Sequence, residues 1–176
     1  MSAQDQTREP RQYFFTQSFG DLPEELQTVR TQGKKGILFF FEAENCPYCH
    51  YMLQHVFNQK NVQDWYQKRF MSLAIDIHGD VDLKDFDGVT LPSKIFAEQR
   101  RVVITPVMMF IDLDGNEVYR HLGMIKTPEE FLLLGKYIAS NSYFDMEFKV
   151  YAAHRNETIS DQVLMTPGAQ SDPLKH

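Results

Sequence analysis

The sequence predicts an α/β fold in which helices flank a mixed β-sheet. Three observations support this prediction. Runs rich in apolar, β-branched and aromatic residues at 36–42, 70–77 and 102–113 have the length and composition of core strands. Segments with helical signals lie between these runs. An Asp-Gly pair at 114–115 marks a hairpin turn after the third run, so that one strand pair must be antiparallel.

Length and composition are those of one globular domain. The chain has 176 residues, 43% hydrophobic residues and 13% aromatics, and no apolar stretch is long enough to span a membrane. The net charge of −6 argues against nucleic acid or an anionic membrane surface as the main partner. We expect a polar N-terminal extension at 1–19, a folded domain at 20–151 and a flexible C-terminal tail at 152–176.

The first half of the chain carries clear signals for where helices begin. Asp21 and Glu24 form a capping-box pattern that opens a helix, and Gly33 is placed to end it. Pro47 suits the first turn of another helix. In order, we expect a loose segment at 1–12, a helix at 21–30, a strand at 36–42, a helix at 47–57 that resumes at 61–68, and a strand at 70–77.

The second half ends its predicted core in a well-signalled helix. Thr127, Pro128 and Glu130 combine a cap, a first-turn proline and a capping-box acid. In order, we expect a polar loop at 79–90, a short helix at 91–99, a strand within 102–113 that Pro106 interrupts, a strand at 117–122 and a helix at 127–139. Residues 143–151 could pack as a strand or a helix, and 155–176 resemble a tail without a core.

The two cysteines of the chain, Cys46 and Cys49, form a C-x-x-C motif directly after the first predicted strand. A cysteine at the start of a helix meets unpaired backbone N–H groups and the positive end of the helix dipole, which stabilise a thiolate. A second cysteine three positions on lies one turn away and can resolve a mixed disulfide. The pattern therefore predicts a redox-active dithiol with Cys46 as the nucleophile and Cys49 as the more buried, resolving thiol.

The motif is also compatible with two other kinds of site. With His50, the motif also spells C-x-x-C-H, the attachment site of c-type haem, but strand-like surroundings are not those of a haem-binding helical domain. A zinc site would need a second ligand pair. His50 and His55 are five apart on the predicted helix and so point in different directions. A thiol role is favoured over both.

Taken in order, these motifs resemble the thioredoxin superfamily over roughly residues 20–151. The matching features are the strand before the C-P-Y-C motif, Thr105-Pro106 in the place of the cis-proline loop, the hairpin at 112–116 and Gly123 before a capped helix. The chain looks most similar to the bacterial group that includes SoxW-type periplasmic thioredoxins and the catalytic domains of DsbC-like proteins. The resemblance implies a thioredoxin fold and places substrate contacts at Pro47, Tyr48, Thr105 and Pro106.

The sequence also departs from thioredoxin. Asn45 replaces the usual Trp before the first cysteine, and Phe40 lies where many thioredoxins bury an acid. Removing the proton of Cys49 then needs another route, for which Glu42 or Glu44 acting through water are candidates. About twenty extra residues between Cys46 and Pro106 are assigned to an inserted loop and helix at 79–99, which either shape partner choice or are a tolerated surface elaboration.

The resemblance implies a thiol–disulfide oxidoreductase that acts on protein disulfides, most simply a periplasmic reductase that works as a monomer without a cofactor. It further implies a membrane electron donor of the DsbD/CcdA kind. The start of the chain lacks signal-peptide features, so we expect a mature periplasmic form, with the cytoplasm as the alternative. A disulfide oxidase or isomerase, a non-catalytic binding module and a haem protein stay open as alternatives.

Overall fold

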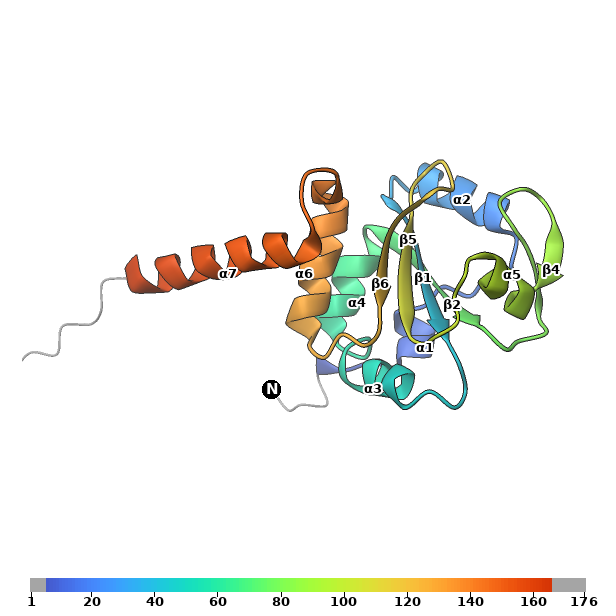
Figure 1. The fold of residues 1–176 in the computed structure, drawn as a ribbon, viewed down its shortest axis with the longest axis horizontal. Helices are drawn as coiled ribbons and strands as arrows, with labels where there is room; N and C mark the ends of the chain where they lie inside the picture. The colour runs from blue at the N-terminus through green and yellow to red at the C-terminus, as the bar shows by residue number, and fades with distance from the viewer. Residues whose placement is uncertain (1–5, 166–176) are drawn as a thin grey trace, which may run out of the picture.

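The structure, a computed structural model, describes residues 6–165 and their side chains as far as residue 156 (Figure 1). Its strands are β1 (Gly36–Glu42), β2 (Phe70–Asp76), β3 (Asp82–Lys84), β4 (Thr90–Pro92), β5 (Val107–Ile111) and β6 (Glu117–Leu122). Its helices are α1 (Pro10–Tyr13), α2 (Leu22–Thr31), α3 (Pro47–His55), α4 (Lys60–Gln67), α5 (Ser93–Gln99), α6 (Pro128–Ala139) and α7 (Phe148–Met165), with a 3-10 turn at Ser142–Phe144.

The main sheet has the strand order β2-β1-β5-β6. Strand β1 pairs in parallel with β2 and antiparallel with β5, and the hairpin through Gly115 pairs β5 with β6. Gly115 has a φ of 84°, a left-handed conformation that glycine adopts without steric cost. The predicted mixed sheet and its flanking helices are therefore confirmed.

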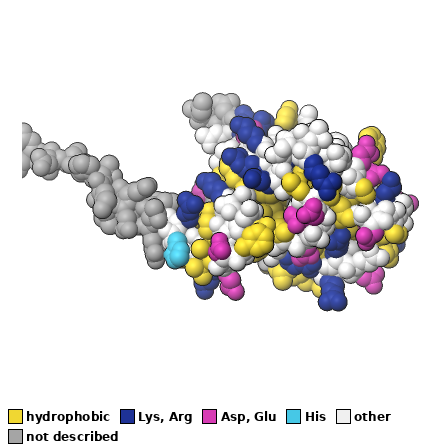
Figure 2. Space-filling model, turned by 90° about the horizontal axis from the view of Figure 1, so that it is seen from above, with side chains coloured by type: hydrophobic (Ala, Val, Ile, Leu, Met, Phe, Trp, Pro, Cys, Tyr) yellow, Lys and Arg dark blue, Asp and Glu magenta, His cyan; other side chains and the backbone are white. Residues whose placement is uncertain are grey.

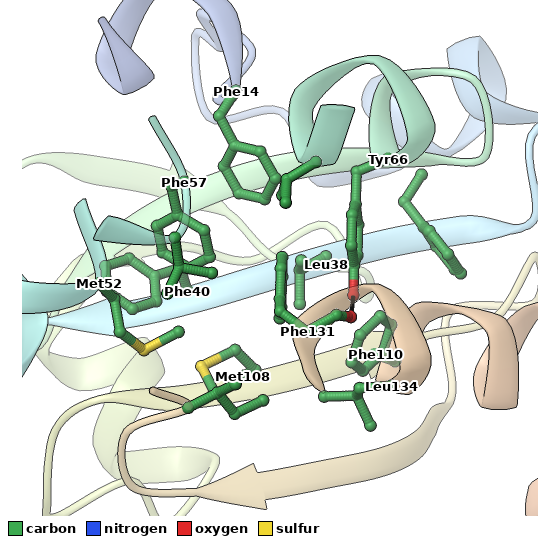
Figure 3. Close-up of a cluster of buried hydrophobic side chains, with 14 of the residues drawn as sticks. Phe14, Leu38, Phe40, Met52, Phe57, Tyr66, Met108, Phe110, Phe131 and Leu134 are labelled. Carbon is green, nitrogen blue, oxygen red and sulfur yellow. Dashed lines mark hydrogen bonds between the residues drawn. The ribbon is translucent and has the colours of Figure 1, made fainter. Parts of the chain in front are cut away.

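Two apolar layers cover the two faces of this sheet. Alternate residues of β1 and β5 point to opposite faces, so Phe40 and Met108 enter one layer while Phe39 and Met109 enter the other. The first layer also contains buried residues of α3, α4 and α6, and the second contains those of α2 and α5. Figure 3 shows the first layer, in which Tyr66 donates a hydrogen bond of 2.6 Å to the carbonyl of Phe131.

The helices with the strongest sequence signals begin where they were predicted. The carboxylate of Asp21 accepts a hydrogen bond from the N–H of Glu24 at the start of α2, and the hydroxyl of Thr127 does the same for Glu130 at the start of α6. The four helices at 22–31, 47–55, 60–67 and 128–139 differ from the predicted bounds by only one or two residues.

The expectation of a loose N-terminal segment is wrong for its described part. Residues 10–13 form α1, and Thr7 pairs with Gln59 in an isolated bridge. Phe14 and Phe15 then enter the first apolar layer, where the Phe14 ring stacks on Phe57 with centroids 4.5 Å apart (Figure 3). The burial of these rings ties the segment to the domain.

Two further predictions need correction. Residues 79–90 were expected to be a loop, but β3 and β4 pair there as a small antiparallel hairpin. The predicted flexible tail is helical at 152–165, because α7 continues through these residues and projects away from the sheet (Figure 1). Residues 1–5 and 166–176 lie outside the described residues.

Candidate active site

Cys46 occupies the N-cap of α3, immediately after the turn that follows β1. Its backbone is extended, with φ −104° and ψ 100°, and Pro47 takes the first helical position, where a missing N–H costs nothing. The Cys46 sulfur accepts a hydrogen bond from the N–H of Cys49 at 3.1 Å. The cap therefore aims an otherwise unpaired helix N–H at this sulfur.

Cys46 and Cys49 form a disulfide in the structure, with their Cα atoms 5.2 Å apart. Both side chains are buried, but to different degrees. Both cysteines lie within the first apolar layer, where Cys46 retains 6% of its surface exposed and Cys49 retains 1%. The exposed fractions have the predicted order, with Cys46 as the less buried residue.

Pro106 lies at the same end of the sheet as the cysteines. It directly precedes β5, whose first residue, Val107, is opposite Phe41 near the end of β1. The Thr105–Pro106 peptide bond is cis, and the Pro106 carbonyl accepts a hydrogen bond of 2.9 Å from the N–H of Gly123. Within the described residues, the Thr105 backbone makes no hydrogen bond to another part of the chain.

Exposed apolar side chains occur on the segments that meet at this end of the sheet. Tyr48 in the first turn of α3 is 60% exposed, and Ile104 before the cis bond is 53% exposed. Val103 and Leu122 are also exposed, and Leu122 is opposite Val107. Only Tyr48 was singled out from the sequence, although the apolar run at 102–104 just before Thr105-Pro106 was a signal for the others.

The nearby carboxylates are arranged differently from what the sequence suggested. Both oxygens of Glu42 accept hydrogen bonds from the Arg11 guanidinium, at 2.5 and 2.8 Å. The hydrogen bond to Glu42 raises the pKa of Arg11. With both of its oxygens engaged, Glu42 is poorly placed to act as a base for Cys49, and α1 supplies a contact to the end of β1 that sequence reasoning missed.

Phe40 and the active-site loop complete the surroundings of the dithiol. The Phe40 side chain is fully buried in the layer that contains Cys49, so no carboxylate takes the place of the acid found in many thioredoxins. Glu44 is exposed, and its backbone carbonyl lies 2.7 Å from Nε2 of His50. This contact joins the His50 side chain to the turn that precedes Cys46.

The described part of the chain contains neither a candidate metal site nor a candidate membrane-spanning helix. Among residues 6–156, no group of three or more His, Cys, Asp or Glu side chains is arranged to hold a metal ion. None of the helices within residues 6–165 is both long enough and apolar enough to cross a membrane.

Some proteins of known structure resemble this chain. Two structures share the fold at low identity: a thioredoxin-fold protein from Helicobacter pylori (20% identity, TM-score 0.58, covering 72% of this chain and 87% of that one) and the DsbH oxidoreductase (16% identity, TM-score 0.51, 80% and 94%). A thioredoxin from Thermus thermophilus matches with 25% identity and a TM-score of 0.49, covering 69% and 84%. No curated protein matches the chain.

A family model described as a thioredoxin-like domain matches residues 22–139, which extend from the start of α2 to the end of α6. The matched range contains β1, the disulfide and the cis-proline loop. This fold and the cysteine pair at its active-site position support thiol–disulfide redox activity. The chain is therefore a member of the thioredoxin-like domain family.

Proposed function

We propose that this protein reduces disulfides of other proteins in a bacterial periplasm. The observation that carries the proposal is the hydrogen bond from the Cys49 N–H to the Cys46 sulfur at the start of α3. This donor is free to stabilise negative charge on Cys46 once the disulfide is reduced. The periplasmic location rests on the sequence resemblance to periplasmic thioredoxin-like proteins, and the direction of electron flow rests on the Pro47-Tyr48 pair, which is similar to that of glutaredoxins.

The proposed reaction has two exchange steps. The Cys46 thiolate attacks one sulfur of the substrate disulfide, and the other substrate sulfur leaves as a thiolate and takes up a proton. Cys49 then loses its proton and attacks the Cys46 sulfur, which releases the second substrate thiol and forms the Cys46–Cys49 disulfide seen in the structure. The substrate gains two electrons and two protons. A membrane donor of the DsbD/CcdA kind is proposed to return the dithiol to its reduced state.

The substrate is proposed to dock as an extended segment across the cis-proline loop. The unpaired backbone of Thr105 offers hydrogen-bonding groups to such a segment, as an edge strand would. Pro106 removes a competing N–H at this point. Pro47, Tyr48 and the exposed side chain of Ile104 supply apolar surface around it.

Trapping the mixed disulfide tests this proposal. Cys49→Ser leaves Cys46 able to attack but removes the thiol that resolves the intermediate, so a disulfide-bonded reporter peptide should remain covalently attached in a one-to-one adduct. The matched variant Cys46→Ser should give little or no adduct, because Cys49 is the more buried thiol. Mass spectrometry reports both results. Equal trapping by the two variants, or trapping by neither, contradicts the proposed roles.

The substrate-docking part of the proposal has its own variant. Pro106→Ala leaves both cysteines in place but restores an N–H beside Thr105. Turnover of the reporter peptide should fall, or the mixed disulfide should accumulate. Unchanged turnover would place substrate docking elsewhere.

A further inference from the structure

Strand β2 forms one edge of the main sheet, and its backbone groups alternate between two directions. The N–H of Ile77, just beyond β2, donates to the carbonyl of Glu42 and therefore faces β1. Because backbone groups alternate along a strand, the N–H and carbonyl groups of Phe70, Ser72, Ala74 and Asp76 face the opposite way, away from the sheet. These four residues form the outer edge of β2.

The outer edge is only partly covered by the rest of the chain. At one end, Thr16 donates its N–H to the Ser72 carbonyl at 2.9 Å. At the other end, the Ser93 hydroxyl donates to the Asp76 carbonyl, also at 2.9 Å. Between them, neither backbone group of Ala74 has a hydrogen-bond partner among the described residues. An edge with unpaired backbone groups is a template for an added strand.

The chain that starts to cover this edge turns away from it. After Thr16 it runs to Gly20, whose carbonyl accepts a hydrogen bond of 2.7 Å from the N–H of Lys84 at the end of β3. A cavity of about 570 Å³ lies between the segment at 16–20 and strand β2. A space of this size beside Ala74 accommodates a few residues of extended chain, which rise about 3.3 Å each.

The cavity combines apolar walls with negative charge. Apolar residues from β2, α2 and β3 line it, and the exposed Val81 stands at its rim. Its lining includes four charged residues, of which Arg11 and Glu42 neutralise each other. The exposed carboxylates of Asp76 and Asp82 form no ion pair within the described chain. The unpaired edge is thus flanked by two uncompensated negative charges.

We propose that the outer edge of β2 binds an extended, basic segment of a partner polypeptide as an added strand. Backbone pairing with Ala74 supplies the register, an apolar side chain of the segment enters the cavity, and neighbouring lysines or arginines meet Asp76 and Asp82. Figure 2 shows that charged side chains of both signs are interspersed on one face of the molecule. This surface does not depend on the dithiol chemistry.

A peptide titration tests the proposal. The probe is a fluorophore-labelled Lys-Val-Lys-Val-Lys peptide, followed by anisotropy at low salt. Wild-type protein should bind it saturably, and Ala74→Pro should weaken binding about tenfold, because proline removes the outward N–H and its hydrogen bond. Ala74→Ser keeps the amide and should bind as wild type does. Asp76→Asn combined with Asp82→Asn should weaken binding severalfold, and added salt should do the same.

Amide chemical shifts in the wild-type protein provide a readout that does not require the proline variant to fold. Addition of the peptide should shift amides at 72–76 and 16–20. Shifts centred on Tyr48 and Ile104 would place the peptide at the dithiol and overturn the proposal. Absence of saturable binding up to about 1 mM, or equal binding by a folded Ala74→Pro variant, would overturn it as well.

Discussion

At the scale of single residues, the environment of Cys46 differs from that of Cys49. Both cysteines lie in the apolar layer that contains Phe40, but the Cys46 sulfur accepts an N–H from the first turn of α3, and Cys49 is the more buried of the two. Hydrogen bonding to the charged form of a thiol favours the thiolate, and burial without a partner disfavours it. The two thiols of the reduced protein should therefore differ in reactivity.

The first prediction concerns the acidity of Cys46. In a Cys49→Ser variant, the pKa of the Cys46 thiol should lie well below the value of about 8.5 for a free cysteine. The rate of alkylation by iodoacetamide, measured against pH, gives this pKa directly. An inflection near 8.5 would remove the basis for assigning Cys46 as the nucleophile.

A second prediction concerns His121 on β6. Burial lowers the pKa of this histidine below 6.5, and the charge of Glu130 opposes that shift only in part. Because the folded protein binds the proton less readily than the unfolded chain, the histidine's contribution to stability is present above pH 6.5 and is lost as the pH falls through the folded-state pKa.

Urea unfolding at pH 7.5 and at pH 5 should show this dependence. His121→Gln should lose less stability than the wild type between the two pH values. The exposed His78 provides a matched control, since His78→Gln should leave the wild-type pH dependence in place. An identical loss in wild type and His121→Gln would contradict the prediction.

At the scale of elements, helices and strands with strong local sequence signals could be predicted, whereas those that depend on contacts between distant residues could not. The bounds of β1 and α6 follow from an apolar run and from the Thr127 cap, which are properties of neighbouring residues. The β3–β4 hairpin also had a local signal, since Asp87-Gly88 lies in its turn, but the surrounding acidic residues made the segment read as a loop. Helix α1 had a local signal in Pro10, which lies in its first turn, but the burial of Phe14 could not be predicted because it depends on contacts with Phe57 and Phe131, far away in the sequence.

The third prediction tests the role of the N-terminal segment in the core. Phe14 is 2% exposed, and truncation to alanine leaves a cavity beside Phe57, so Phe14→Ala should lower the free energy of unfolding by about 3–5 kcal/mol. Phe19 is fully exposed, and Phe19→Ala should change the free energy of unfolding by no more than about 0.5 kcal/mol. Chemical denaturation measures both. A small effect of Phe14→Ala would mean that the segment is only loosely attached.

At the scale of the whole molecule, the order of motifs was enough to predict the fold and the position of the cysteines. Strand β1 delivers Cys46 to the start of α3, and β5 brings Pro106 to the same end of the sheet, as the sequence order requires. The pairing of Arg11 with Glu42 and the open edge at Ala74 could not be predicted, because both depend on where the N-terminal segment packs. The core topology is thus encoded locally, whereas the surfaces around it arise from tertiary contacts.

Redox equilibration against glutathione buffers measures whether Cys46 and Cys49 act as an exchanging dithiol pair. Thiols are counted by alkylation and mass spectrometry after each mixture reaches equilibrium. We expect Cys46 and Cys49 to be oxidised and reduced together in a two-electron transition, with a potential of roughly −200 to −270 mV, the range of glutaredoxins and thioredoxin that the Pro47-Tyr48 pair suggests. A pair that does not exchange with glutathione would contradict thiol–disulfide activity, and a potential near roughly −120 mV would contradict the reductase direction.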